Sequence, residues 1–361
     1  MRLRFKEDID LVRERMLAFW EHKMADRALI SAIAPKAPGL HIDMFHNEKD
    51  LTCDPEALRR YWEDPETIYR NNIKRLENTY LGGETLPLIF QNYGTSGHCN
   101  YFGAVPKYGN DTIWFDPVWE DLSRADSAYT EERLKKHLEI AKYLTDRAGE
   151  DYLVGMPDST GTIDALGHLY GPENVLTDML DAPEKVKHAI QTVNEGWKKT
   201  NEMFYKISRE HNEGGVHAWM HLYAPGRLTH MQCDTSVMFS KAMYEEFVLD
   251  ELYQQMDWLE YPVYHFDGIE QTRHLDLLLS LTKLKAIQWT HVAGQPSAKH
   301  YMPTLQKIQK AGKSLIIMTP AEDIPELLAA LSAKGLYLHT EVATVEEAKA
   351  LVAYTEENSC A

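Results

Sequence analysis

The sequence predicts an α/β protein in which all 361 residues form a single (β/α)8 barrel of the TIM type. Eight short apolar segments recur along the chain, and most of them are followed by a segment with helical periodicity. The hydrophobic content of 44% lets a chain of this length bury one large core. Polar side chains follow the ends of several apolar segments, which is where a barrel carries its site. An open, doubly wound parallel sheet is the alternative.

The first half of the chain is expected to be the less regular half. A charged, amphipathic helix within residues 1–27 precedes the first strand. A long excursion over residues 95–130, with a strand-like stretch at 112–115, is expected to cover the barrel mouth, because loops of this length are usually functional. The expected strands are 28–35, 85–94, 152–158 and 216–223. The expected helices are 54–78 with a break near Pro65, 131–148 and 183–207.

The second half alternates more regularly. Ser240 is placed to cap a helix, and Gly312 stands where a helix C-terminal glycine is common. Thr344 and Glu347 have the spacing of a capping box for the last helix. The expected strands are 262–268, 285–291, 313–319 and 335–341. The expected helices are 241–260, 271–281, 299–310 and 321–334.

The net charge and the spacing of the cysteines limit which classes of partner and which compartment are expected. A formal net charge of -17 argues against nucleic acid and anionic membranes as partners. No apolar run has the roughly 18 residues that a membrane span needs. The four cysteines are widely spaced, which disfavours a disulfide framework and favours the cytoplasm. They are Cys53, Cys99, Cys233 and Cys360.

The fifth expected strand carries the strongest chemical signal. His265 and Asp267 are two residues apart, so both side chains leave the same face of an extended backbone. An imidazole and a carboxylate there suit a divalent metal or an acid–base pair. The alternative is a buried histidine bonded to its neighbouring aspartate. His339 and Glu341 repeat the arrangement on the last strand. We therefore expect a metal bound by His265, Asp267 and Glu341, with His339 or Cys233 as alternatives for the third place.

Other polar residues at the expected strand ends complete the predicted site. None of these side chains is a lysine or arginine, so the mouth suits a metal, a cation or a neutral polar ligand. The residues expected to act as acid or base are Asp158, His221 and His291. Those expected to bind a small-molecule substrate are Asn92, Tyr93, Tyr223, Gln288 and His339.

The chain resembles the uroporphyrinogen decarboxylase superfamily, and in particular its zinc-dependent corrinoid:thiol methyltransferases. The segments that carry this resemblance are 19–27, 232–236, 240–247, 264–268 and 284–289. The resemblance implies a barrel, a bound zinc ion and a corrinoid, or a corrinoid protein, as the partner in methyl transfer. Members of that branch bind zinc through a His-x-Cys pair and a later cysteine. His265 matches their histidine, whereas Asp267 stands in place of the first cysteine and Glu341 or His339 lies near the second.

This substitution leaves other activities open. Carboxylate ligands make a harder Lewis acid than thiolates do, and favour oxygen ligands and activated water. A metal-dependent lyase, hydrolase or isomerase acting on a small oxygenated substrate is therefore the alternative, and a non-catalytic binding protein is a third possibility. Porphyrinogen decarboxylation is disfavoured, because the segment 34–39 lacks the arginines that bind the tetrapyrrole carboxylates in that branch.

Overall fold

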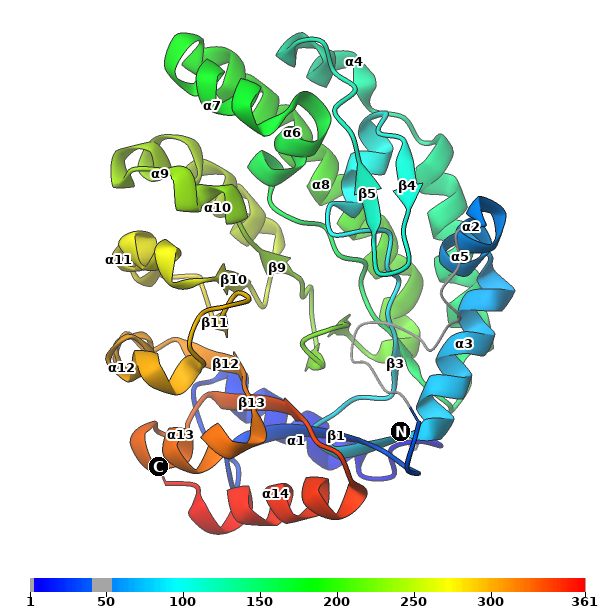
Figure 1. Ribbon diagram of the computed structural model, residues 1–361, viewed down its shortest axis with the longest axis vertical. Coiled ribbons are helices and arrows are strands. Elements are labelled where there is room, and N and C mark those ends of the chain that lie inside the picture. The colour runs from blue at the N-terminus through cyan, green and yellow to red at the C-terminus, as the bar shows by residue number, and fades with distance from the viewer. Residues whose placement is uncertain (1–2, 41–53, 361) are drawn as a thin grey trace.

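The computed structural model describes residues 3–40 and 54–360, and shows an α/β fold around a central, mostly parallel sheet (Figure 1). The sheet has seven strands in the order β2-β1-β13-β12-β11-β10-β9, and only β2 runs antiparallel to its neighbour. These strands are β1 (Leu29–Pro35), β2 (Thr79–Gly83), β9 (His230–Met231), β10 (Val263–Asp267), β11 (Ala286–Thr290), β12 (Ser314–Met318) and β13 (Leu336–Glu341).

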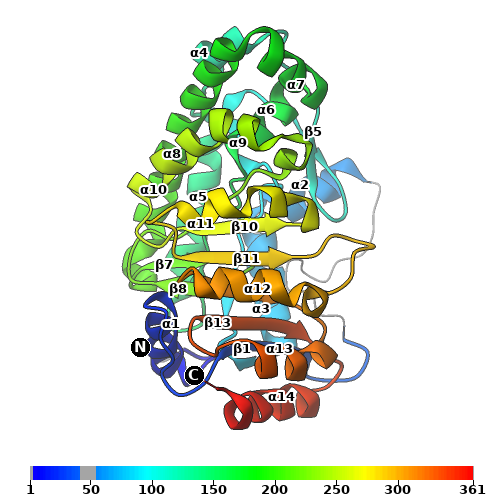
Figure 2. The ribbon, with the colours of Figure 1, turned by 90° about the vertical axis from the view of Figure 1, so that its left-hand side faces the viewer.

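The strand order decides between the two expected sheets. From β9 to β13 each strand lies beside the next one in the chain, and β1 then pairs with β13. This order lacks the reversal that defines a doubly wound sheet. Figure 2 shows β10 and β11 side by side and β13 further along the sheet, all pointing the same way, with helices over one face. The fold is therefore compatible with a TIM-like arrangement.

The first half departs from the expected strands. The segments 85–94 and 152–158 contribute only β3 (Leu88–Ile89) and β6 (Leu153–Val154), which pair with each other. The prediction of one strand over 216–223 is wrong: β7 (Gly215–His217) and β8 (Leu222–Ala224) are antiparallel, with a turn between them. The turn contains no glycine or proline and ends at His221, whose φ of 47° is left-handed. The place beside β10 belongs to β9 instead.

The helices follow the expected pattern with three additions and shifted ends, and the single helix expected over 241–260 is divided into two at Val248. The break near Pro65 is confirmed between α2 and α3, and so is the capping box of Thr344 and Glu347. The helices are α1 (Ile9–Trp20), α2 (Pro55–Glu63), α3 (Pro65–Asn78), α4 (Ala125–Ala128), α5 (Glu132–Ala148), α6 (Thr162–Tyr170), α7 (Pro172–Asp181), α8 (Pro183–Asn212), α9 (Lys241–Phe247), α10 (Leu249–Trp258), α11 (Leu275–Ser280), α12 (Met302–Lys310), α13 (Ile324–Ala330) and α14 (Val345–Asn358).

Two of the additions are α6 and α7, for which the sequence suggested at most a loop or a helix start, and the third is α4. The expected excursion over 95–130 contains α4 and a short hairpin, β4 (Pro106–Tyr108) with β5 (Ile113–Phe115). No helix among the described residues is both long and apolar enough to cross a membrane. Cys99, Cys233 and Cys360 are free thiols, and Cys53 lies outside the described residues.

Alternation along the strands separates two apolar clusters. Tyr264 and Phe266 of β10 pack in the cluster shared with the helices, whereas Val263 packs with α1 in the other cluster. That second cluster joins α1 to the inner face of the sheet at the strand starts, through Ala286, Ile316 and Tyr337 among others. α1 therefore packs against the sheet where the strands begin. Polar side chains on the same face lie near the other end of the strands, where the strands finish.

A buried carboxylate ties α1 to the sheet. Glu84, which follows β2, is fully buried and accepts hydrogen bonds from Arg27 at 2.7 and 2.9 Å and from Arg15 of α1 at 2.9 Å. It also accepts the backbone N–H of Ile30 in β1 at 2.8 Å. Two guanidinium groups thus compensate one carboxylate away from water, which such a charge requires.

We expect Glu84→Gln to lower the free energy of unfolding by about 3–5 kcal/mol, because it leaves the buried guanidinium group of Arg27 without its counter-charge, whereas Arg15 keeps its ion pair with Asp26. Urea denaturation followed by circular dichroism measures this change. Glu77→Gln is the matched control: Glu77 pairs with Arg4 at the surface, 3.0 Å away, and its loss should cost less than about 1 kcal/mol. Equal effects of the two substitutions would contradict the role given to Glu84.

Candidate metal centre

Three side chains at the carboxyl ends of β9 and β10 are grouped closely enough to bind one metal ion. Asp234, His265 and Asp267 each offer a ligand atom, and these atoms all lie within 4.8 Å of one another. His265 and Asp267 share the inner face of β10, as their spacing predicted. Asp234 begins the short 3-10 helix Asp234–Met238 that follows β9. One imidazole and two carboxylates are ligands that zinc and similar ions accept.

The neighbouring strand orients His265. The Nδ1 atom of His265 is hydrogen-bonded to the amide oxygen of Gln288, and the Gln288 amide nitrogen donates to Thr290 Oγ1 at 2.5 Å. Because an amide oxygen only accepts, Nδ1 of His265 carries the proton. The lone pair is then on Nε2, which is the form of a metal-ligating histidine held by an outer-sphere partner.

A chain of hydrogen bonds orients Asp234 in the same way. The Gln232 amide nitrogen donates to Asp234 Oδ2 at 2.8 Å, while its amide oxygen accepts from His230 Nε2 at 2.7 Å. His230 Nδ1 lies 2.8 Å from His217 Nε2, so His217 is the donor of that pair. Asp234 Oδ1 is buried and has no hydrogen-bond partner among the described residues. One oxygen is thus held, and the other is left for a ligand.

The first turn of α6 and the glycine that precedes this helix hold the backbone of this segment. Asp164 accepts the N–H groups of Asp234 and Thr235 at 2.9 and 2.8 Å. Gly161 lies so close to the Gln232 carbonyl that a Cβ atom would be 2.0 Å from its oxygen. Only glycine permits this approach, which brings Asp164 against the residues that follow β9.

Burial and like charges perturb the group. Burial raises the pKa of Asp234 well above its usual range, and the carboxylates of Asp164, Asp267 and Asp158 add to that shift. Burial lowers the pKa of His265, against the opposing effect of Asp267. The histidine is therefore neutral, as a metal ligand must be, and a divalent cation would relieve the repulsion among the carboxylates.

A cavity of about 420 Å³ adjoins His265. Its wall combines strand ends with Thr95 and the tip of the β4–β5 hairpin. The lining residues are Phe90, Asn92, Thr95, Asp111, Thr112, Asp158, Trp219, His265, Thr290 and Met318. A second hollow of about 270 Å³ shares Thr95 and is lined by Asp164, Gln232 and Asp234 among others. The metal group thus lies beside two hollows, the larger of which is in the size range of small-molecule sites.

The structure does not bring the expected third ligands to this group. Glu341 ends β13, which is separated from β10 by the two strands β11 and β12, and is exposed beside Pro320 and Val342 in a surface hollow. Its strand extends past β12, whose last residue pairs with His339. The Cys233 thiol is fully buried in the apolar cluster, and burial raises its pKa well above the usual range. Asp234, next to Cys233, occupies the third place.

Of the three expected acid–base residues, Asp158 lines the cavity. Its Oδ1 lies 3.2 Å from His230 Nε2. His221 instead lies in the turn before β8, where its Nδ1 accepts the N–H of Leu86 at 3.2 Å and burial lowers its pKa to about 3. His291 follows β11 but is not among the residues that line the cavity.

Of the residues expected to bind substrate, one lines the cavity and the others lie elsewhere. Asn92 lines the cavity, whereas Gln288 holds His265. Tyr223 lies on the α1 side, where its hydroxyl donates to the Glu213 carbonyl at 2.8 Å. His339 is buried against the ring of Tyr337, 4.0 Å between centroids, and does not line the cavity.

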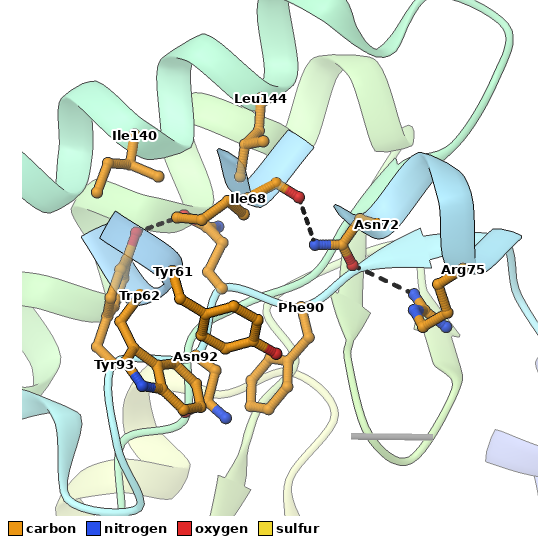
Figure 3. Close-up of a pocket in the computed structure, with 11 residues that line it drawn as sticks. Tyr61, Trp62, Ile68, Asn72, Arg75, Phe90, Asn92, Tyr93, Ile140 and Leu144 are labelled. Carbon is orange, nitrogen blue, oxygen red and sulfur yellow. Dashed lines mark hydrogen bonds between the residues drawn. The ribbon is translucent and has the colours of Figure 1, made fainter. Parts of the chain in front are cut away.

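Tyr93 belongs to a separate, small hollow between α2, α3, α5 and β3 (Figure 3). Its ring stacks on His137 with centroids 3.8 Å apart, and its hydroxyl donates to the His137 carbonyl at 3.2 Å. The hollow measures about 30 Å³, which is enough for about one water molecule. Tyr93 therefore supports the structure and does not face the larger cavity.

Sequence reasoning missed several residues of the site. His230, Gln232 and Asp234 alternate along the chain, a pattern that would have placed them on one face of an extended segment. The expected strand over 216–223 concealed it. Trp219 lies in the unforeseen turn, with its ring 5.2 Å from that of His265, and nothing local signalled it.

A scan against known protein families gives no match, and no curated protein matches the sequence. The fold is similar to a solved structure described as a methyltransferase from Methanosarcina mazei, with a TM-score of 0.60. The two chains share 13% sequence identity, and the similarity covers 96% of this chain and 98% of that one. At this identity the likeness shows a shared fold over nearly the whole chain.

We expect the purified protein to bind about one zinc or similar divalent ion per chain. His265→Ala and Asp234→Asn should each weaken zinc binding by more than about 100-fold, because even outer-sphere partners are worth 10–100-fold. Elemental analysis and zinc titration measure the effect. Glu341→Gln and Cys233→Ser are the controls and should retain the ion. Full zinc content in His265→Ala would show that the metal group is wrong.

Glu251 makes stability depend on pH. Burial raises the pKa of Glu251 from 4.5 to about 7, against the hydrogen bonds from Thr162 and Gln255 that lower it. The folded protein therefore keeps a proton that the unfolded chain releases, and stability falls as the pH rises from about 4.5 to about 7. The loss is about 3 kcal/mol. Glu251→Gln should remove this slope in urea titrations, whereas Glu246→Gln, which changes an exposed residue of α9, should retain it.

Proposed function

We propose that this protein is a metal-dependent methyltransferase of the uroporphyrinogen decarboxylase-like barrels, which moves a methyl group between a corrinoid and a small acceptor or donor. The observation that carries the proposal is the group of Asp234, His265 and Asp267 beside a cavity of about 420 Å³. The fold shared with a methyltransferase over nearly the whole chain supports it. The isolated bridge between Met156 and His217, together with the β3–β6 pair, supports closure of the strands into a barrel.

The donor set fits a zinc ion. Asp234 Oδ1 is buried without a partner among the described residues, and hydrogen bonding leaves His265 Nε2 with its lone pair. Bound there, zinc would supply Lewis acidity that lowers the pKa of a coordinated thiol, alcohol or water. The corrinoid would be a partner's cofactor that approaches the mouth, since a cavity of this size encloses only a small molecule.

Residues of the chain would orient the metal ligands and shape the cavity for the reaction. Gln288 and Gln232 fix the orientation of His265 and Asp234 through hydrogen bonds. Trp219 forms an apolar wall next to His265 that excludes water from one side of the cavity. Of the two carboxylates that line the cavity, Asp158 is the one beside His230, and it would accept or deliver a proton at the bound substrate.

The donor set also favours a second candidate, a metal-dependent lyase, hydrolase or isomerase acting on an oxygenated substrate. Two carboxylates and no thiolate make a hard site that prefers oxygen ligands. Porphyrinogen decarboxylation gains no support, because none of the described residues lining the two hollows is an arginine or lysine.

Spectrophotometry with methylcobalamin tests the proposal. The zinc-loaded protein, mixed with methylcobalamin and a panel of thiols and amines, should change the cobalt spectrum by demethylation. His265→Ala should abolish the change, and Glu341→Gln should retain it. Metal-dependent turnover of hydroxy or oxo acids without any change at cobalt would overturn methyl transfer in favour of the second candidate.

A further inference from the structure

The smaller of the two hollows beside the metal group, which Asp234 also lines, is rich in hydroxyl groups. Four hydroxyl side chains line it, namely Thr95, Ser96, Thr160 and Thr235. Its volume of about 270 Å³ is about nine times the roughly 30 Å³ that one water molecule occupies in the liquid. The hollow is therefore large enough for a small organic molecule, and its lining can hydrogen-bond to one.

Two of these hydroxyl groups are buried and have hydrogen-bonding capacity left. Ser96 is 1% exposed and directly precedes the 3-10 helix Gly97–Phe102, yet its side chain does not cap that helix. Thr160 is 4% exposed, and its Oγ1 accepts a hydrogen bond from the Gln232 amide at 2.7 Å, which leaves its own proton for another acceptor. Because incomplete hydrogen bonding of a buried hydroxyl costs free energy, a polar ligand in the hollow would be stabilised by these groups.

Gly167 keeps this hollow open. It lies inside α6, and a Cβ atom at this position would meet nothing nearer than Pro172, at 3.9 Å. Packing therefore does not require a glycine here, and its φ is not positive. Glycine destabilises a helix relative to alanine. What the glycine provides is space, because a larger side chain would extend into the hollow that Gly167 lines.

We infer that this hollow binds a small neutral molecule that carries several hydroxyl groups, a polyol or a sugar. Serine and threonine hydroxyls both donate and accept hydrogen bonds, as the hydroxyls of such a ligand do. An anion would be repelled by Asp164 and Asp234, since none of the described residues that line the hollow is a lysine or arginine.

An organic cation fits the same lining poorly. The described lining residues include no phenylalanine, tyrosine or tryptophan whose ring face could bind a cation. The Asp164 carboxylate already accepts three hydrogen bonds, from the backbone N–H groups of Asp234 and Thr235 and from the Thr235 hydroxyl. Its charge is therefore used within the protein, and the hydroxyl groups are left to select a neutral ligand.

The place of the hollow links such a ligand to the metal group. Asp234 lines the hollow and belongs to the metal group with His265 and Asp267. A bound polyol therefore places hydroxyl oxygens beside the metal group, and a metal with two carboxylate ligands favours oxygen as a further ligand. The inference deepens the proposed function by naming a substrate class, and it rests on that function for the reaction, whereas binding depends on the hollow alone.

Calorimetric titration of the zinc-loaded protein tests the ligand class. D-glucose, myo-inositol and xylitol are the neutral probes, and D-glucosamine and D-glucuronate are the charged forms of the first ring. At least one neutral probe should bind with a Kd of about 1 mM or lower, and at least about tenfold more tightly than either charged form. Preference for the two ring compounds or for xylitol distinguishes a sugar-like ligand from an open-chain polyol. Absence of binding by all three neutral probes, or tighter binding of a charged form, would overturn the inference.

Substitutions at Gly167 locate the binding. Gly167→Leu should weaken binding of the best neutral probe by more than about tenfold, because its side chain occupies the hollow, and Gly167→Ala should weaken it less. Both residues favour a helix more than glycine does, so both variants should fold. Unchanged binding by Gly167→Leu would show that the ligand does not occupy this hollow.

Removal of a single hydroxyl tests the hydrogen bonding. Ser96→Ala should weaken binding by about three- to tenfold, the value of about one hydrogen bond. Ser280→Ala and Thr177→Val are the matched controls, because their exposed hydroxyls donate within their own helices and do not line the hollow. A loss in the controls equal to that in Ser96→Ala would refute the role of Ser96.

Zinc content, measured on every sample, separates this inference from the proposed function. Zinc uptake without binding of any neutral probe overturns the polyol site and leaves the metal group standing. Binding of a neutral probe by protein that takes up no zinc supports the polyol site and overturns the metal proposal.

Discussion

The packing of α1 against the start of the sheet depends on one buried charge, the carboxylate of Glu84. It receives Arg15 from α1, Arg27 from the segment before β1 and a backbone N–H of β1, so three parts of the chain meet at one carboxylate. α1 and its apolar partners pack against the sheet at this end of the strands, and not at the end that carries Asp234 and His265. The polar residues there are free to serve a ligand.

Buried carboxylates at the two ends of the strands differ in how their charge is compensated. Glu84 has two arginines, whereas Asp234 lies among Asp158, Asp164 and Asp267 and is described with no lysine or arginine in its hydrogen bonds. The charge of Glu84 is thus compensated by arginines, whereas the carboxylates around Asp234 lack a compensating positive charge among the described residues. A proton or a bound cation would supply the missing positive charge, whereas the neutral amides of Gln232 and Gln288 orient Asp234 and His265 without neutralising the carboxylates.

The sequence predicted most where period and register are strong. The strands β10 to β13 lie where apolar runs and turn residues placed them, and the two-residue spacing put His265 and Asp267 on one face. It predicted least where structure depends on tertiary contacts. The turn between β7 and β8 has no glycine or proline, so residues 216–223 looked like one strand, and His221 and Tyr223 were assigned to the wrong end. Glu341 has the same local pattern as Asp267, but whether a strand end faces inward depends on how far its neighbours extend, which no local pattern contains.

The pairing of β1 with β13 has a consequence for how the chain is made. Synthesis delivers β1 and β2 early, and these strands can pair at once, with Glu84 between them and α1. The other edge of β1 stays without its partner until residues 336–341 have left the ribosome, because Leu29 pairs with Tyr337, which follows it by 308 residues. A nascent or truncated chain therefore carries an open strand edge, a template for association with other chains. β13 thus covers the strand edge of β1 that would otherwise be exposed. Removing β13 and α14 by truncation would leave that edge open and make the sheet prone to aggregation.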